Sequence, residues 1–188
     1  MLRIVTGKAK NKKLKSLEGD ATRPTSERIK EAMFSAIQFD VESRRVLDLF
    51  AGTGQLGLEA VSRGAESVTF VDSERVAMDV VKENARAVGC FSECRYSVSD
   101  WRNFIRKAEG RDKYDLVFID PPYSMECCAK AAELLAQSGI IIPGAILVLE
   151  SGTEEIDTAY LETLGYEIIK STHYGKKTAL NILLYRGC

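Results

Sequence analysis

The sequence contains a single histidine, His173, and five cysteines with no C-x-x-C pair among them. A serine–histidine–aspartate triad or a two-histidine metal site would have to use His173. A structural zinc site needs about four ligands, which this spacing does not offer. We therefore expect no metal, a histidine at the surface or at a strand end, and reduced cytosolic thiols, with Cys127 and Cys128 adjacent on a helix.

Long apolar runs are also absent. No run approaches the about 18 residues that a membrane-spanning helix needs, and the basic N-terminus has no apolar stretch of the kind found in secretory signals. We expect a cytoplasmic chain with no membrane association. Its 188 residues are 45% apolar and 28% charged, which is typical of a soluble globular protein and unlike disordered, collagen-like or coiled-coil chains.

Net charge is nearly absent as well, at −1. That total argues against nucleic-acid binding, which usually accompanies a strongly basic balance. The charge is unevenly spread, however: residues 1–30 hold nine Lys and Arg against three Asp and Glu, giving +6, and the remainder carries −7. The basic segment can neutralise phosphates, although a solvated basic strand is an alternative interpretation.

The basic segment has a predicted structure of its own. Residues 2–6 and 12–17 surround the turn-prone GKAKN and predict an extended pair. Thr25 or Ser26 can then cap a helix that runs to about residue 38. Its apolar stripe, which would dock on the rest of the protein, comprises Ile29, Met33, Ala36 and Ile37.

From residue 45, short buried runs alternate with helices. The runs cover residues 45–50, 67–72, 94–99, 114–120, 145–150, 166–172 and 178–186. Helices at about 56–63, 74–88, 100–108 and 125–138 separate the first five, a pattern that predicts a parallel sheet covered on both faces. The short loop between the last two predicts an antiparallel hairpin.

The predicted fold class is therefore α/β: a doubly wound, mostly parallel, seven-stranded Rossmann-like sheet ending in an antiparallel hairpin. We divide the chain into a basic N-terminal extension of hairpin and helix, residues 1–40, and the sheet domain, residues 41–188.

A glycine-rich loop follows the first strand of the sheet. In DLFAGTGQLG, Gly52, Gly54 and Gly57 have the G-x-G-x-x-G spacing that lets the backbone turn tightly beside a ligand. Asp72 ends the next strand twenty residues after Gly52, where a carboxylate can accept hydrogen bonds from ribose hydroxyls. NAD, FAD and S-adenosylmethionine sites share this pattern, and a glycine turn with no ligand is the alternative.

Among these three ligands, Asp48 favours S-adenosylmethionine. A carboxylate beside the loop would repel a pyrophosphate but suits the ammonium of an amino-acid moiety. Asp100 could accept from the adenine amino group with Trp101 as a flat wall, or it could simply cap a helix; the sequence leaves both open. The cofactor candidates are Asp48, Phe50, Ala51, Gly52, Thr53, Gly54, Gly57, Asp72, Ser73, Asp100 and Trp101.

A second candidate loop follows the fourth strand, at Asp120, Pro121, Pro122 and Tyr123. Two prolines fix two φ angles and remove two amide donors, so the loop is stiff and presents carbonyl acceptors beside a carboxylate. These suit a base with an exocyclic amine: Asp120 and the Pro121 carbonyl would accept its two N–H bonds while Tyr123 stacks on the ring. Fixing both hydrogens orients the nitrogen toward a sulfonium methyl, and Asp120 stabilises the charge that develops. A turn without chemistry is the alternative.

These residues also carry a resemblance. VLDLFAGTGQLGLEA with FIDPPY resembles the Rossmann-fold S-adenosylmethionine-dependent amino-group methyltransferases with a D/N-P-P-Y/F motif. RIVTGKAKNKKL, RPTSERIKEAMFSAI and YGKKTAL narrow the resemblance to the RsmD-like family, which methylates guanine N2 in 16S rRNA of the small ribosomal subunit. The sequence departs from the common pattern of the family at two places. AGTGQLG replaces the commoner AGSGALG, and Thr keeps the hydroxyl; Asp72 replaces a frequent Glu and keeps the carboxylate.

The resemblance implies that residues 51–54 and Asp72 bind the cofactor and that residues 120–123 bind the base. It places the basic hairpin and the start of the following helix near RNA. The target base would have to be flipped out or already unpaired to reach Asp120. The RNA-binding candidates are Arg3, Lys8, Lys10, Lys12, Lys13, Lys15, Arg23, Thr25 and Arg28.

Our leading hypothesis is a monomeric enzyme that methylates the N2 amine of a guanine in 16S rRNA, with an assembled or assembling small subunit as substrate. Adenine-N6 or cytosine-N4 methylation of DNA remains an alternative, because the acceptor loop suits any exocyclic amine. A non-catalytic ribosome-assembly factor on the same fold is a second alternative. An NAD-dependent oxidoreductase is the third, and it lacks an obvious acid–base group other than His173.

Overall fold

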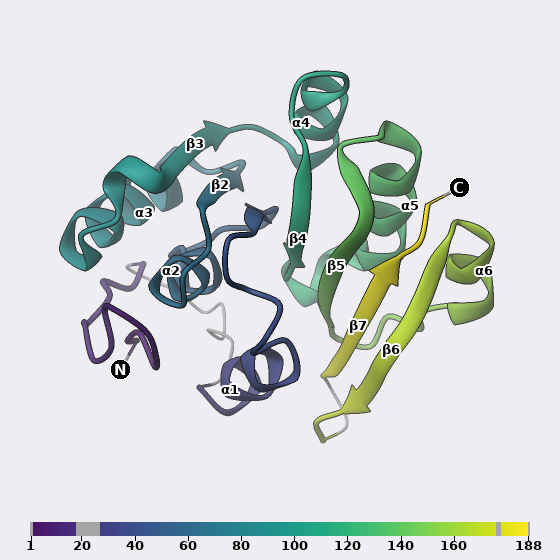
Figure 1. Cartoon of the computed structure of the whole chain (residues 1–188), viewed down its shortest axis with the longest axis horizontal. Coiled ribbons are helices and arrows are strands. Elements are labelled where there is room, and N and C mark those ends of the chain that lie inside the picture. The colour runs from purple at the N-terminus through teal and green to yellow at the C-terminus, as the bar shows by residue number, and fades with distance from the viewer. Residues whose placement is uncertain (1, 18–26, 176–177, 188) are drawn as a thin grey trace. The chain divides into compact units, whose positions relative to one another are not determined.

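The computed structural model describes residues 2–17, 27–175 and 178–187, which form two compact units, Met1–Trp101 and Arg102–Cys188 (Figure 1). The hairpin and the first helix lie in the same unit as the first three strands of the sheet. The domain boundary that the sequence predicts near residue 40 stays a prediction. The helix cap expected at Thr25 or Ser26 lies outside the described residues.

The first unit contains three parallel strands in the order β3-β2-β1: β1 (Arg45–Asp48), β2 (Ser67–Asp72) and β3 (Cys94–Val98). The connections contain α2 (Gln55–Ser62) and α3 (Arg75–Val88). The apolar residues of β1 and β2 are buried, which is why they appear in the sequence as continuous runs. The predicted strand–helix alternation is confirmed here, with boundaries that differ by a few residues.

Helix α1 (Glu27–Ala36) is shorter than predicted and its packed face is different. Ile29, Met33 and Ile37 are buried as expected. Ala36 was expected on this face but is exposed. Phe34 is fully buried instead, next to Met33 and four residues after the buried Lys30. The helix therefore docks through a wider apolar face than the four-residue repeat indicated.

The N-terminal hairpin is confirmed as a short antiparallel pairing. Arg3 and Lys13 form an antiparallel bridge. The Ile4 amide donates to the Lys12 carbonyl at 2.9 Å, and the Leu14 amide donates to the Leu2 carbonyl at 2.9 Å. Ile4 and Leu14 are buried, so the pair has one packed face and one exposed basic face.

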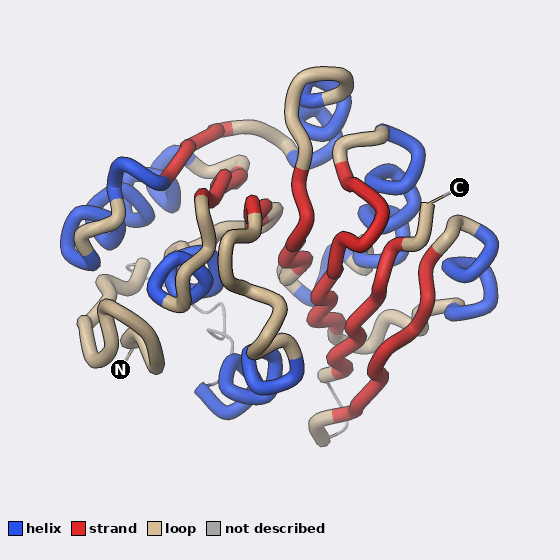
Figure 2. Tube along the Cα trace, in the orientation of Figure 1, coloured by secondary structure: helices blue, strands red, loops and turns tan. Residues whose placement is uncertain are grey.

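The second unit contains four strands in the order β4-β5-β7-β6: β4 (Tyr114–Ile119), β5 (Ile141–Ser151), β6 (Tyr166–His173) and β7 (Ala179–Tyr185). Strand β5 runs parallel to β4, and β7 is antiparallel to both β5 and β6. The predicted terminal antiparallel hairpin is confirmed. Figure 2 draws the strands of this unit in red.

Three helices accompany these strands: α4 (Trp101–Ala108), α5 (Cys128–Ser138) and α6 (Thr158–Thr163). Helix α6 was not predicted. Helix α5 begins three residues later than expected, because Tyr123–Met125 form a single 3₁₀ turn, η2. In the described part of the chain no helix is long and apolar enough to cross a membrane. The four described cysteines, which include Cys127 and Cys128 at the start of α5, are free thiols.

Candidate functional site

The glycine loop between β1 and α2 depends on two left-handed residues. Gly52 has φ 52° and Gly54, which precedes α2, has φ 78°. Both φ angles lie in the left-handed region that residues with a Cβ atom rarely adopt. A Cβ built on Gly52 would meet nothing within 4 Å, so the backbone is open to a ligand at this position.

Gly57 has a different role from the other two glycines. A Cβ at this position would overlap the ring of Phe70 and lie 2.7 Å from Val68 Cγ2, both on β2. The absence of a side chain therefore lets α2 pack closely on β2, the role expected of the third glycine in such a loop. The Gly57 amide also donates to Asp48 Oδ2 at 3.0 Å.

Asp72, at the end of β2, holds the glycine loop directly. Its Oδ2 accepts from the Gly52 amide at 2.8 Å and its Oδ1 accepts from the Glu74 amide at 2.9 Å. Burial raises the pKa of this carboxyl, and the two amide bonds lower it in part. Each carboxylate oxygen has further acceptor capacity, so a ribose hydroxyl can still bind without displacing the loop.

Asp48 is almost fully enclosed, with 1% exposure. Burial raises its pKa to about 7; the Gly57 amide bond opposes this rise, and the nearby negative charge of Asp72 adds to it. A carboxyl in such a setting gains strongly from a cation brought beside it, because the cation favours the ionised form. This environment is compatible with the predicted role of Asp48 toward an ammonium group.

The structure buries the ring expected to face adenine. Trp101 is 3% exposed, and its ring packs 5.9 Å from that of the half-buried Phe50. The ring of Trp101 is therefore largely covered by the protein, and the roles expected of Trp101 and Phe50 beside the cofactor stay predictions. Asp100 directly precedes α4 and is half-buried, so both interpretations of this residue remain predictions.

The other cofactor candidates differ in their exposure. Ala51 and Thr53 are buried within the glycine loop, and Ser73, next to Asp72, is exposed. Of these three, only Ser73 presents its side chain to solvent.

In the second unit, the Asp-Pro-Pro-Tyr loop follows β4. Asp120 is half-buried, Pro121 is buried and Pro122 is exposed. The Pro122 carbonyl accepts from the Met125 amide at 2.9 Å, which closes η2. No hydrogen bond from the described residues reaches the Pro121 carbonyl, so this oxygen keeps its acceptor capacity, and it follows Asp120 directly in the sequence.

Tyr123 is anchored by two residues that the sequence did not predict. Its hydroxyl donates to Glu150 Oε1, on β5, at 2.8 Å and pairs with Thr178 Oγ1 at 2.9 Å. A Cβ on Gly152 would lie 2.7 Å from Tyr123 Cγ, so this glycine leaves room for the ring. Burial raises the pKa of Tyr123 to about 12, which keeps the hydroxyl protonated. Thr178 lies in the YGKKTAL segment, a signal that could have found it; Glu150 resembled an ordinary strand residue.

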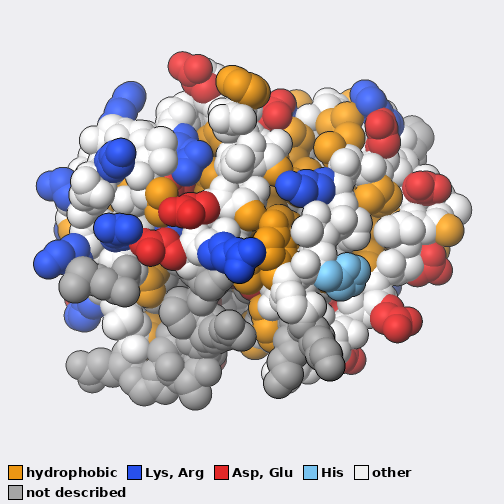
Figure 3. Space-filling model, turned by 90° about the horizontal axis from the view of Figure 1, so that it is seen from below, with side chains coloured by type: hydrophobic (Ala, Val, Ile, Leu, Met, Phe, Trp, Pro, Cys, Tyr) orange, Lys and Arg blue, Asp and Glu red, His pale blue; other side chains and the backbone are white. Residues whose placement is uncertain are grey.

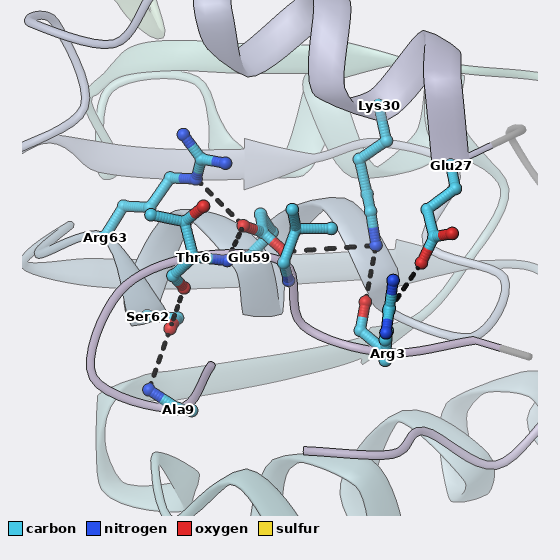
Figure 4. Close-up of polar contacts among 9 residues, drawn as sticks. Arg3, Thr6, Ala9, Glu27, Lys30, Glu59, Ser62 and Arg63 are labelled. Carbon is cyan, nitrogen blue, oxygen red and sulfur yellow. Dashed lines mark hydrogen bonds and ion pairs between the residues drawn. The ribbon is translucent and has the colours of Figure 1, made fainter. Parts of the chain in front are cut away.

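The basic hairpin is docked on α2 through Glu59, a carboxylate with 0% exposure. The amides of Val5 and Thr6 donate to its oxygens at 2.7 and 2.9 Å. Figure 4 shows Thr6 beside Glu59. Arg63 Nε donates to the same carboxylate at 2.9 Å, and Lys30 Nζ lies 3.9 Å from it. Burial lowers the pKa of Lys30, and Glu59 opposes the shift. A buried carboxylate with these partners fixes the hairpin backbone.

The turn of the hairpin approaches α2 closely. A Cβ on Gly7, which has φ 86°, would overlap the Ser62 carbonyl. Ser62 Oγ donates to the Thr6 carbonyl at 2.6 Å and accepts from the Ala9 amide at 3.0 Å. These contacts use the hairpin backbone and leave its basic side chains outside.

The predicted RNA-binding side chains of the hairpin are exposed. Arg3 pairs with Glu27 and Lys15 with Glu83, whereas four lysines form no ion pair with any described residue: Lys8, Lys10, Lys12 and Lys13. In Figure 3, Lys and Arg side chains gather at the left, where Figure 1 draws the hairpin and α3. Such a surface offers phosphates four uncompensated cations.

Three other predictions concern single residues. Arg28 is exposed on the first turn of α1, and Arg23 and Thr25 lie outside the described residues. His173 ends β6 and is exposed, so its predicted position at a strand end is confirmed. Within the described residues no cluster of three or more potential metal ligands occurs.

Comparison with solved structures defines the class. The chain matches the Escherichia coli "Putative methyltransferase yhhF" with a TM-score of 0.85 and 25% identity, covering 99% of this chain and 98% of that one. It matches the Thermus thermophilus protein TTHA0928 with a TM-score of 0.79 and 27% identity, covering 98% and 99%. The predicted fold class, a seven-stranded Rossmann-like sheet of the methyltransferase type, is confirmed.

The chain belongs to the family described as "Conserved hypothetical protein 95", whose model matches residues 2–183. Its relatives include Ribosomal RNA small subunit methyltransferase D of Haemophilus influenzae, 31% identical over 151 residues, which cover 80% of this chain and 78% of the relative. The Escherichia coli protein of the same name is 29% identical over 153 residues, covering 81% and 76%. The RsmD-like resemblance is thereby confirmed.

Proposed function

We propose that the chain is an S-adenosylmethionine-dependent methyltransferase that methylates the N2 amine of a guanine in 16S rRNA. The observation that carries the proposal is the loop after β4, where the Pro121 carbonyl accepts no hydrogen bond from the described residues and lies next to the Asp120 carboxylate in sequence. The relatives named as small-subunit rRNA methyltransferases support the choice of substrate.

The first unit would hold the cofactor. Asp72 would accept from the ribose while keeping the glycine loop in place, and the open backbone at Gly52 would lie against the ligand. Asp48 would favour the ammonium of the amino-acid moiety. When bound, S-adenosylmethionine supplies an electrophilic methyl group on a sulfonium. A structure of a more distant protein with this fold, at 13% identity, is a complex with SAH, which supports this assignment.

The second unit would present the base. The N2 amine of guanine is a weak nucleophile because its lone pair is delocalised into the ring. Asp120 and the Pro121 carbonyl would accept its two N–H bonds and so orient the nitrogen lone pair, a positioning effect. Asp120 would also stabilise positive charge that develops on nitrogen and accept the proton that leaves. Tyr123, anchored at its hydroxyl, would hold the ring by stacking.

The hairpin would hold the rRNA. Its lysines are fixed to α2 through the backbone, so their ammonium groups can meet phosphates without pulling the docking contacts apart. We infer that the protein acts as a cytoplasmic monomer on an assembled or assembling small subunit.

Methyl transfer and cofactor binding test the proposal together. Purified full-length protein with methyl-labelled S-adenosylmethionine should label small subunits from a strain that lacks the protein. In thermal-shift measurements, S-adenosylhomocysteine should raise the melting temperature and NAD should not. No label in rRNA, or stabilisation by NAD alone, would refute the proposal.

A further inference from the structure

One buried amide connects the basic hairpin with the glycine loop. Asn84, on α3, is 2% exposed. Its Oδ1 accepts from the Lys15 amide at 2.7 Å, and its Nδ2 donates to the Lys15 carbonyl at 3.1 Å. The same Nδ2 donates to the carbonyl of Thr53, within the glycine loop, at 2.9 Å. Both N–H bonds and the oxygen of the amide are therefore used.

Among the described residues, the contacts that Glu59 and Ser62 make with the hairpin do not involve the glycine loop. Glu59 binds the amides of Val5 and Thr6 from α2, and Ser62 binds Thr6 and Ala9. Asn84 differs because its two N–H bonds are shared between the last extended segment of the hairpin and the loop. A shift of either segment changes the hydrogen-bond geometry available to the other.

We propose that Asn84 is a positioning residue that couples cofactor binding to RNA binding. The inference rests on the proposed function, because it takes the glycine loop as the cofactor site and the hairpin as the RNA site. A cofactor that orders the loop fixes the Thr53 carbonyl and, through Asn84, the backbone at Lys15. Since coupling between two sites is reciprocal, RNA on the hairpin increases cofactor affinity by the same factor.

The test measures the dissociation constant of S-adenosylhomocysteine with and without saturating small subunits from a strain that lacks the protein. Asn84→Asp keeps an acceptor for the Lys15 amide and removes the donors to Thr53 and Lys15. We expect this variant to bind S-adenosylhomocysteine about fivefold more weakly, as expected for the loss of the one hydrogen bond that reaches the glycine loop. The small subunit should change that affinity no further.

Ser62→Ala is the matched control, because it removes a docking contact of the hairpin that does not touch the loop. It should keep the wild-type affinity for S-adenosylhomocysteine and the wild-type increase with small subunits. Equal cofactor affinities in Asn84→Asp and Ser62→Ala, or an undiminished increase in Asn84→Asp, would overturn the role of Asn84. Wild-type protein that does not bind S-adenosylhomocysteine at all would instead refute the proposed function.

A measurement on the wild type keeps the inference testable if the Asn84→Asp variant does not fold. Hydrogen exchange reports local opening at individual amides. S-adenosylhomocysteine should slow exchange at the Lys15 amide and leave the Ala9 amide, which Ser62 holds, unchanged. Equal exchange at Lys15 with and without the ligand would contradict the coupling.

Discussion

The Tyr123 hydroxyl donates a hydrogen bond to Glu150 Oε1 across 2.8 Å. The ring that we expect to stack on the base is therefore tied to the end of β5, while Thr178, the residue directly before β7, holds the same hydroxyl. An aromatic ring fixed at its far end loses little further freedom when a base stacks on it. The anchor gives the loop a rigidity that two prolines alone would not provide.

Removing this anchor should alter turnover more than folding. Tyr123→Phe keeps the ring and loses both hydroxyl contacts, so we expect kcat to fall about threefold to tenfold, in line with one or two modest hydrogen bonds. Tyr123→Ala also removes the stacking surface and should lower kcat/KM about a hundredfold, because base–aromatic stacking contributes about 1–3 kcal/mol. Steady-state methyl transfer to small subunits measures both. Equal rates in the two variants would contradict a stacking role.

Asp120 should be required for chemistry and not for cofactor binding. Asp120→Asn keeps an oxygen acceptor but lacks the charge that stabilises the developing cation, so we expect kcat to fall about a hundredfold to a thousandfold. Its affinity for S-adenosylhomocysteine should stay within twofold of the wild type. Asp120→Ala separates the enzyme from an assembly factor: if the protein acts only by binding the ribosome, this variant would keep its full biological effect.

Asp48 should give opposite pH dependences of stability and cofactor affinity. Burial raises its pKa from 3.8 to about 7 in the folded protein. Its contribution to stability is therefore fully present below its unfolded value and is lost as the pH rises through about 7. The ionised Asp48 carboxylate attracts the ammonium group of the ligand, so the affinity for S-adenosylhomocysteine should rise over the same pH range. Denaturant unfolding and calorimetry at pH 5 and 8 measure the two effects.

Asp48→Asn is the control for this pH dependence. It keeps an acceptor for the Gly57 amide and cannot ionise, so both trends should flatten relative to the wild type. Parallel pH curves for the two proteins would contradict the raised pKa.

The third glycine of the loop should be required for stability. Alanine normally favours a helix interior over glycine by about 1 kcal/mol, but a Cβ at Gly57 would overlap Phe70 and Val68. We expect Gly57→Ala to lower the free energy of unfolding by about 1–3 kcal/mol, as overpacked cores do. Ser35→Ala, at an exposed position of α1, should change it by less than about 0.5 kcal/mol. A stabilised Gly57→Ala protein would disprove the close packing of α2 on β2.

The unpaired hairpin lysines should set the salt dependence of RNA binding. Replacing Lys8, Lys10, Lys12 and Lys13 with glutamine should reduce the slope of log affinity against log salt by about 3, if each contacts one phosphate. A double variant of two exposed lysines elsewhere, Lys107→Gln with Lys130→Gln, should leave the slope unchanged. Filter binding of rRNA over a salt series measures it. The same slope in both variants would show that the hairpin lysines do not contact the phosphates of the RNA.

The strand and helix order could be predicted because buried apolar runs and amphipathic segments leave local periodic signals. Helix α6 escaped prediction because it has only six residues, and its cap, Asp157 accepting from the Tyr160 amide, differs little from an ordinary turn. The exposure of Ala36 was missed because its spacing from Met33 indicates the apolar face, whereas the helix ends at Ala36 and leaves this residue exposed.

The glycine and Asp-Pro-Pro-Tyr loops were predictable because each is a compact run with unusual backbone chemistry. Their supporting contacts were not, because they join residues far apart in the chain. Glu59 binds a hairpin more than fifty residues away, and Asn84 binds Lys15 and Thr53. Only the folded chain brings such residues together, so a buried Asn or Glu in a helix looks like a surface residue from the sequence alone.

Nucleoside analysis of methylated RNA tests the central claim most directly. Small subunits from a strain that lacks the protein are incubated with the purified chain and methyl-labelled S-adenosylmethionine, and their 16S rRNA is digested and separated by mass spectrometry. The account predicts label in N2-methylguanosine at a single nucleotide. Label in N6-methyladenosine or N4-methylcytidine, or none in the rRNA, would contradict it.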